Sequence, residues 1–252
     1  RCYGFFPPRL PDEPLIFVEV ALMNQITASI TPLLDEAAAP VDISRATTAI
    51  FYSISNTQTG LRGVSFGDSL IKTVVEQLLQ EFPKLRQFAT LSPIPGFRSW
   101  LGKNAADVWE SADKRLRAEL GKALDKADPT ADDWISALEQ PGQWQPGDPA
   151  AKLLMHAAAR YLGKSLVKDK PVDPVARFHL GNGSRVERLN WAGDTSTKGI
   201  KQSYGLMVNY LYDLADIEAN FFALLSPAAL RDAPATFITS IHVDPHRHDG
   251  LA

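Results

Sequence analysis

The chain has 252 residues, of which 45% are hydrophobic and 22% are charged, as in a globular protein of one large domain or two small ones. Its net charge of −3 offers no basic surface for nucleic acid, and no apolar run reaches the roughly 18 residues that cross a membrane. The single cysteine, Cys2, excludes an internal disulfide framework and is typical of a reducing compartment.

The first hundred residues predict a β-α-β unit. Apolar, β-branched and aromatic residues predict strands over 15–22 and 49–55, with a short helix expected over 26–37. The glycine-bearing loop "NTQTGLRGVSFG" then leads into an amphipathic helix, and a third strand ends at Ser92. The second and third strands are therefore expected to be parallel neighbours. The apolar stripe of the helix consists of Leu70, Ile71, Val74, Val75, Leu78 and Leu79.

Residues 100–165 predict a helical insertion between sheet elements, interrupted by "QPGQWQPGDP". The segment "VARFHLGNGSRVERLNW" predicts two strands joined by a turn at "GNG", and a last strand is expected over 204–212. From Pro227 the tail is rich in proline, histidine and aspartate, and we expect it to be poorly ordered. The whole chain is predicted to be an α/β protein with a mixed sheet.

The loop before the amphipathic helix is a candidate anion site. Its glycines, Gly60, Gly63 and Gly67, would free backbone amides at a helix N-terminus, where the helix dipole also favours negative charge. Arg62 adds a positive charge. The alternative is an ordinary glycine-rich turn, because the sequence is neither a P-loop nor a G-x-G-x-x-G motif.

Ser92 is the second candidate, in the stretch "LSPIPGF". Pro93 and Pro95 fix their own φ angles and bias the preceding residues toward extended geometry, so the Ser92 hydroxyl is held in one direction. The alternative is a rigid exit from a strand. No G-x-S-x-G elbow surrounds the serine, so a hydrolase triad is not indicated.

His179 is the third candidate, expected in a short strand before the turn. Histidine titrates near neutrality and can exchange a proton at physiological pH, although a lone strand histidine is more often an ordinary hydrogen-bonded residue. His242, His246 and His248 form a possible metal cluster, but we prefer a solvated tail for them. No metal site is predicted.

Several segments together resemble the malonyl-CoA decarboxylase family, from "RCYGFFPP" to about residue 225 and apart from much of the helical insertion. The most specific are "LSPIPGF" and the later "FHLGNGS", beside "AIFYSISNTQTGLRGVSFGDSLIK" and "YGLMVNYLY". The resemblance implies a single catalytic domain over 1–252, with a fold similar to that of the GNAT acyltransferases: a mixed central sheet flanked by helices.

The resemblance also implies conversion of malonyl-CoA to acetyl-CoA and CO₂ through a thioester enolate, without a metal or organic cofactor. The catalytic residues would be Ser92 and His179. The residues that would bind malonyl-CoA are these two together with the loop Arg62, Gly63, Val64, Ser65, Phe66, Gly67 and Asp68.

Family members carry an N-terminal helical domain used for oligomerisation. We expect such a domain to precede residue 1 in the full-length protein and to make it a homo-oligomer, without nucleic-acid or membrane partners. A cytoplasmic location is expected. The final residues "DGLA" are not a peroxisomal address, and the alternative is a mitochondrial signal in a segment that precedes residue 1. Two alternatives remain open: a GNAT-type acyl-CoA-dependent N-acyltransferase and a non-catalytic CoA-binding module.

Overall fold

The computed structural model describes residues 1–6, 12–35, 37, 42–57, 67–140, 143–168, 170–213 and 238–240. The chain divides into two compact units. Unit 1 comprises Arg1–Ser92, Phe178–Glu187 and Val208–Asp232, and unit 2 comprises Pro93–Arg177, Arg188–Met207 and Ala233–Ala252. No helix in the described ranges is long and apolar enough to span a membrane.

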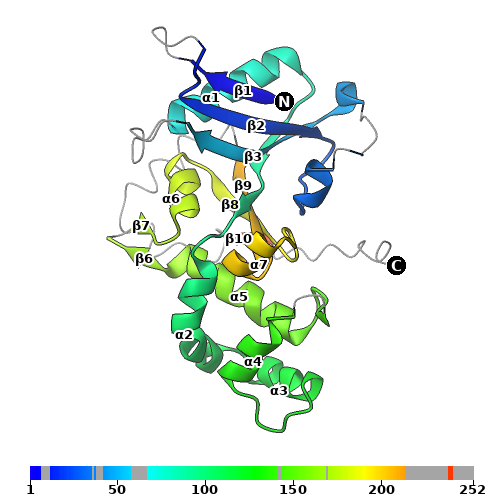
Figure 1. The fold of residues 1–252 in the computed structure, drawn as a ribbon, viewed down its shortest axis with the longest axis vertical. Helices are drawn as coiled ribbons and strands as arrows, with labels where there is room; N and C mark the ends of the chain where they lie inside the picture. Colours follow the sequence, from blue (N-terminus) through cyan, green and yellow to red (C-terminus); the bar gives the residue numbers. More distant parts are fainter. Residues whose placement is uncertain are drawn as a thin grey trace. The chain divides into compact units, whose positions relative to one another are not determined.

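The main sheet has the strand order β1-β2-β3-β4-β9-β8-β10, with the two-residue strand β5 paired to β9 (Figure 1). It is mixed: β3 and β4 are parallel, as predicted, whereas β1–β2, β2–β3 and β4–β9 are antiparallel pairs. The strands are β1 Cys2–Phe5, β2 Ile16–Met23, β3 Thr48–Asn56, β4 Gln87–Thr90, β5 Ser92–Pro93, β8 Arg185–Asn190, β9 Met207–Tyr212 and β10 Ile238–Ser240. A separate short hairpin pairs β6, Leu166–Val167, with β7, Lys170–Pro171. The predicted mixed α/β fold is confirmed.

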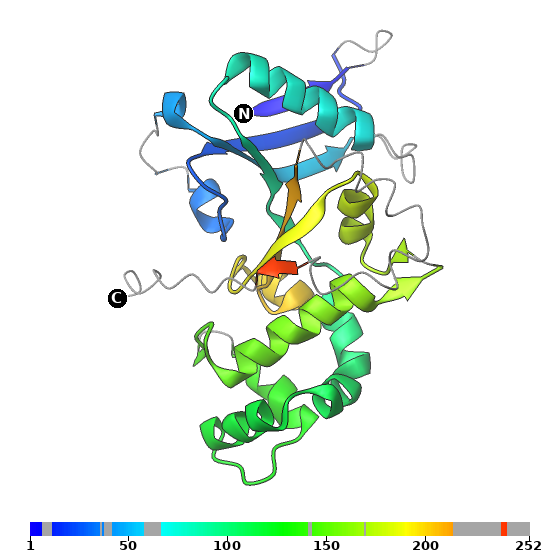
Figure 2. The ribbon, with the colours of Figure 1, turned by 180° about the vertical axis from the view of Figure 1, so that it is seen from behind.

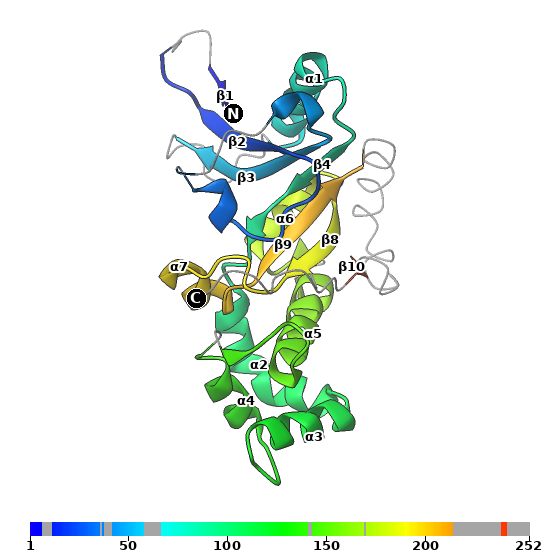
Figure 3. The same ribbon diagram turned by 90° about the vertical axis from the view of Figure 1, so that its right-hand side faces the viewer.

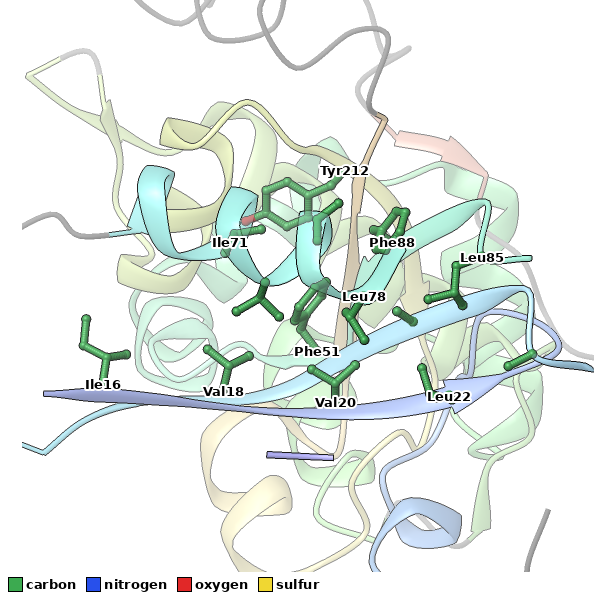
Figure 4. Close-up of a cluster of buried hydrophobic side chains, with 14 residues drawn as sticks. Ile16, Val18, Val20, Leu22, Phe51, Ile71, Leu78, Leu85, Phe88 and Tyr212 are labelled. Carbon is green, nitrogen blue, oxygen red and sulfur yellow. The ribbon is translucent and has the colours of Figure 1, made fainter. Parts of the chain in front are cut away.

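The core of unit 1 lies between helix α1, Gly67–Glu81, and the strands β2, β3 and β4 (Figures 2 and 4). Along β2 every second side chain is buried, as expected for a strand with one face on a core. The predicted stripe of α1 supplies the opposing layer. The buried members of this layer are Ile71, Val74, Val75 and Leu78, with Leu79 partly buried.

Unit 2 contains the helices predicted over 100–165, which begin slightly earlier in the structure (Figure 3). They are α2 Phe97–Ser111, α3 Lys114–Ala123, α4 Ala131–Ala137 and α5 Pro149–Lys164, with α7 Thr197–Ser203 contacting α2. Asp113 caps α3, and Thr130 with Asp133 forms a capping box on α4. Trp134 is fully buried, and its indole N–H donates to the Ala150 carbonyl.

The prediction of a helix over 26–37 is wrong. The described part of this segment contains only a single 3₁₀ turn, η1, Thr31–Leu33, and a second such turn, η2, covers Ile43–Arg45. The Thr27 hydroxyl donates to the Ser29 carbonyl, and the Ser29 hydroxyl accepts from the Thr31 amide. Such local side-chain bonds compete with the helical hydrogen bonds that the prediction assumed.

The prediction of a strand that carries His179 is also wrong, because residues Pro174–Gly181 form helix α6. The Asp173 side chain accepts hydrogen bonds from the amides of Val175 and Ala176, and Pro174 fits the first helical position. "GNG" therefore ends a helix and does not join two strands. The second predicted strand of this segment is confirmed as β8.

The structure differs from the predictions in two smaller respects. The strand expected over 204–212 begins only at Met207, because Tyr204 and Gly205 have positive φ angles of 53° and 82°. In the tail expected to be poorly ordered, Ile238–Ser240 form β10. The remainder of that tail, with His242, His246 and His248, lies outside the described residues.

Candidate active site

Ser92 is the first residue of β5, which follows β4 in the chain and pairs with β9, and its side chain is almost completely buried. Its hydroxyl donates to the Thr90 hydroxyl over 2.8 Å and lies 3.3 Å from Nε2 of His179. The two predicted catalytic residues, 87 positions apart in the chain, are therefore brought together by the fold.

His179 reaches this position from α6, near the end of the helix. Its Nδ1 atom lies 2.8 Å from the hydroxyl of Tyr212 on β9. The imidazole is thus held at both nitrogens, by Ser92 on one side and by Tyr212 on the other. Figure 3 shows α6 beside the neighbouring strands β8 and β9.

The hydrogen bonds favour one arrangement of protons in this network. Because Ser92 donates its proton to Thr90, the bond between Ser92 and His179 requires an Nε2–H that donates to the serine oxygen. Nδ1 then has no proton and accepts one from the Tyr212 hydroxyl. The Thr90 oxygen also accepts from the Tyr210 amide at 3.1 Å. The chain of donors runs from tyrosine through histidine and serine to threonine.

Aromatic rings surround the imidazole. The ring of Tyr210 stacks on His179 at 4.7 Å between centroids, and Phe178 and Tyr212 approach with their rings steeply inclined to it. Burial disfavours the charged form and lowers the pKa of His179 to about 3. The histidine is therefore neutral at physiological pH. The prediction that it titrates near neutrality is wrong, because the sequence could not show how completely it is desolvated.

Asn209 supports the strand end that carries Ser92. Its side-chain amide donates to the backbone carbonyls of Thr90 at 2.7 Å and Thr27 at 3.1 Å. Sequence reasoning missed Thr90, Asn209 and both tyrosines. A usable signal was present in "VNYLY", because alternation along a strand places Tyr210 and Tyr212 on the same face.

Two further polar groups follow His179 in the motif "FHLGNGS". The side-chain nitrogen of Asn182 and the hydroxyl of Ser184 are buried without a hydrogen-bond partner in the described part of the chain. An unsatisfied buried polar group costs about 1–3 kcal/mol. Their backbone amides meanwhile bond to the carbonyl of His179, at 3.1 and 3.2 Å. The two side chains that follow His179 are therefore left with unsatisfied hydrogen-bonding capacity in the described part of the chain.

The predicted substrate loop is largely outside the described residues. Arg62, Gly63, Val64, Ser65 and Phe66 all belong to the segment 58–66, as does Gly60. Gly67 and Asp68 begin α1, as the prediction of a loop leading into a helix requires. Among the described residues there is no cluster of three or more histidine, cysteine, aspartate or glutamate side chains able to hold a metal ion.

Comparison with known proteins yields a coherent set of relatives. The model of the malonyl-CoA decarboxylase C-terminal domain matches residues 1–236. The mitochondrial malonyl-CoA decarboxylase of Anser anser anser is 38% identical over 234 residues, and that of Rattus norvegicus is 36% identical over 242 residues. The matches cover 89% of this chain but 46% and 48% of those proteins, so the chain spans about half the length of the curated relatives it matches.

Two solved structures of malonyl-CoA decarboxylases are similar to this chain. The enzyme from Cupriavidus metallidurans shows 48% identity and a TM-score of 0.75, over 90% of this chain and 56% of the other. The enzyme from Rhodopseudomonas palustris shows 48% identity and a TM-score of 0.72, over 92% of this chain and 52% of the other.

Proposed function

The chain belongs to the malonyl-CoA decarboxylase family, and on this premise we propose that it carries the catalytic site of an enzyme that converts malonyl-CoA to acetyl-CoA and CO₂. The observation that carries the proposal is the buried hydrogen bond between Ser92 and His179. These residues stand in the two segments that most specifically resemble the family, and each has a further partner that fixes its orientation.

The reaction needs groups that stabilise a developing negative charge. When the bond between the carboxylate and the α-carbon breaks, its electron pair passes into the thioester, and CO₂ leaves an enolate. With substrate bound, the enolate oxygen would accept hydrogen bonds from the Ser92 hydroxyl and from Nε2–H of His179, in place of their present acceptors, the oxygens of Thr90 and Ser92. Preorganised donors in a dry site stabilise such charge strongly, because they need no reorganisation during the reaction.

A neutral imidazole suits this role. An imidazolium would attract the substrate carboxylate and so oppose its loss as CO₂, whereas Nε2–H of the neutral ring serves as an uncharged donor. The α-carbon then takes the Nε2 proton while Nδ1 takes the Tyr212 proton. To restore the starting tautomer, Nδ1 returns its proton to the Tyr212 oxygen and Nε2 takes a new proton from solvent. In sum, the substrate loses its carboxylate group as CO₂ and gains one proton.

The experiment that tests the function is turnover of malonyl-CoA with no acyl acceptor present, followed by release of CO₂ and formation of acetyl-CoA. Stoichiometric formation of both products supports decarboxylation. Acyl transfer that requires an added amine would instead place the protein among the acyl-CoA-dependent N-acyltransferases. Binding of a non-hydrolysable malonyl-CoA analogue, with no turnover of malonyl-CoA itself, would indicate that the protein is a non-catalytic CoA-binding module.

We place the CoA phosphates at the loop Arg62–Asp68, on the support of the family resemblance and of the glycine-rich sequence before α1. Arg62→Ala and Gly63→Val should each raise KM for malonyl-CoA about tenfold with little change in kcat. The first removes a charge-assisted contact, and the second adds side-chain atoms where phosphate must approach the backbone.

The control for the arginine substitution is Arg86→Ala, which removes the same charge from an exposed position in unit 1. It should leave KM unchanged. Steady-state kinetics over a range of malonyl-CoA concentrations makes the comparison. A collapsed kcat at unchanged KM in the loop variants would move the CoA site elsewhere.

Tyr212→Phe should lower kcat about tenfold and leave KM nearly unchanged. The substitution removes the hydroxyl that donates to Nδ1, so the tautomer with Nε2–H is no longer favoured. The ring remains in the core of unit 1, and the loss of one hydrogen bond should cost only about 1 kcal/mol of stability.

Tyr3→Phe is the control, because it removes a phenol that is bonded to Glu81 and not to His179. Its kcat should equal that of the wild type. Wild-type kcat in Tyr212→Phe would exclude tyrosine from the proton path.

A further inference from the structure

Asp173 is a fully buried carboxylate whose bonds reach beyond the helix that it caps. One oxygen accepts the amides of Val175 at 3.0 Å and Ala176 at 2.9 Å, the ordinary bonds at the start of a helix. The other oxygen accepts the Tyr161 hydroxyl of α5 at 3.3 Å. The side chain therefore joins the start of α6 to a neighbouring helix.

The same carboxylate is bound to the segment that follows Ser92. The Gly96 amide favours the charged form of Asp173 through a hydrogen bond. Gly96 also packs so closely on the Tyr161 hydroxyl that a β-carbon at this position would collide with it. The glycine of "LSPIPGF" is thus required for close approach, and the motif is packed against Asp173 and Tyr161.

Capping alone does not explain why this carboxylate is buried. Asp113 caps α3 through two equivalent backbone bonds while it remains exposed. Burial raises the pKa of Asp173, and no ion pair in the described part of the chain compensates it. The nearby Arg177 donates instead to the carbonyls of Pro171 and Val172. A buried charge held only by neutral donors is costly, and capping by itself gives no reason for that cost.

We propose that Asp173 is a positioning residue for the catalytic pair, because its carboxylate fixes both the loop that follows Ser92 and the start of the helix that carries His179. Gly96 lies four residues after Ser92, and His179 lies six residues after Asp173 on a continuous helix. A misplacement of about 1 Å in a catalytic pair can cost 10²-fold in rate. As a claim about the reaction, the inference rests on the proposed function.

Asp173→Asn separates the two tasks of the side chain. Asparagine caps helices as well as aspartate, so its amide oxygen can still accept from Val175 and Ala176. Its amide nitrogen, however, would meet the Gly96 amide, donor against donor. We expect kcat to fall about tenfold, with KM within twofold of wild type. Asp113→Asn, the same change at a helix cap without the second set of bonds, should leave kcat unchanged.

Tyr161→Phe provides a second variant in case Asp173→Asn does not fold. It keeps the cap and removes only the phenolic donor to Asp173, so kcat should fall about threefold to fivefold. Melting temperatures are measured beside the kinetics. Wild-type kcat in both folded variants, or a kcat of Asp113→Asn as low as that of Asp173→Asn, would overturn the proposal.

A readout without turnover distinguishes failure of this inference from failure of the proposed function. In the full chain labelled with ¹⁵N-histidine, the wild-type signals of His179 should show a single fixed tautomer, protonated at Nε2. In Asp173→Asn we expect these signals to shift toward an average of the two tautomers, while Asp113→Asn keeps the wild-type pattern. Unchanged His179 signals in Asp173→Asn would refute the positioning role, even if malonyl-CoA is not the substrate.

Discussion

Replacement of His179 by asparagine should lower kcat for malonyl-CoA decarboxylation by about 10²-fold or more, the usual scale for acid–base groups. The variant loses the Nε2–H donor beside Ser92 and the acceptor of the Tyr212 hydroxyl. The affinity for CoA should change little. His156→Asn, a substitution at an exposed position of α5, is the matched control and should retain full activity. Turnover within threefold of wild type would remove His179 from the mechanism.

The same variant has an expected signature in the pH dependence of stability. Burial lowers the pKa of His179 to about 3, below the value of about 6.5 in the unfolded chain, so the unfolded state binds more protons between these values. Wild-type stability should therefore be fully retained above about pH 6.5 and decline as the pH falls toward 3. His179→Asn should lose part of this decline, measured by denaturant unfolding at successive pH values. Equal slopes for both proteins would contradict the buried neutral imidazole.

A second consequence is that His179 should not contribute a limb to the pH–rate profile between pH 6 and 8. The pH dependence of kcat/KM reports the pKa values of groups in the free enzyme. A histidine with a pKa of about 3 does not titrate between pH 6 and 8. Comparison of wild type with His179→Asn over this range makes the test. A neutral-range limb that disappears in the variant would show that the imidazole is charged in the working enzyme.

Ser92→Ala should cost about 3 kcal/mol of transition-state stabilisation, or roughly 10²-fold in kcat. The substitution removes one of the two donors proposed for the enolate oxygen. It also takes from Nε2–H of His179 its acceptor and from the Thr90 hydroxyl one of its donors. Pro93 and Pro95 remain and still fix the backbone, so the melting temperature should change by only a few degrees.

Two further serine variants separate catalysis from structure. Ser92→Thr keeps the hydroxyl but restricts its rotamer, and we expect partial recovery of kcat. Ser203→Ala removes another buried serine hydroxyl, which is bonded to the Leu206 carbonyl, and should lower stability without lowering kcat. Full activity of Ser92→Ala would refute its catalytic role, and an activity loss that tracks the loss of stability would make Ser92 a structural residue.

Local composition and periodicity were sufficient to predict most of the sheet and its covering helix. The apolar composition of β2 and the stripe of α1 are properties of consecutive residues, and the parallel pairing of β3 with β4 follows from the crossover between them. The helical character of 100–165 was likewise evident from its periodicity. Family resemblance, more than periodicity, indicated that Ser92 and His179 act together.

The tertiary structure determined the orientation and the protonation of His179 in the candidate site. Asp173 and Pro174, which are local, start the helix that carries His179. The burial of Asp173 against Tyr161 and Gly96, however, could not be predicted from the residues around the histidine. The neutral imidazole and its Tyr212 partner also depend on β9, which is distant in sequence. Protonation and orientation are set by desolvation and by hydrogen bonds across the fold, and these forces act between neighbours in space and not between neighbours in the chain.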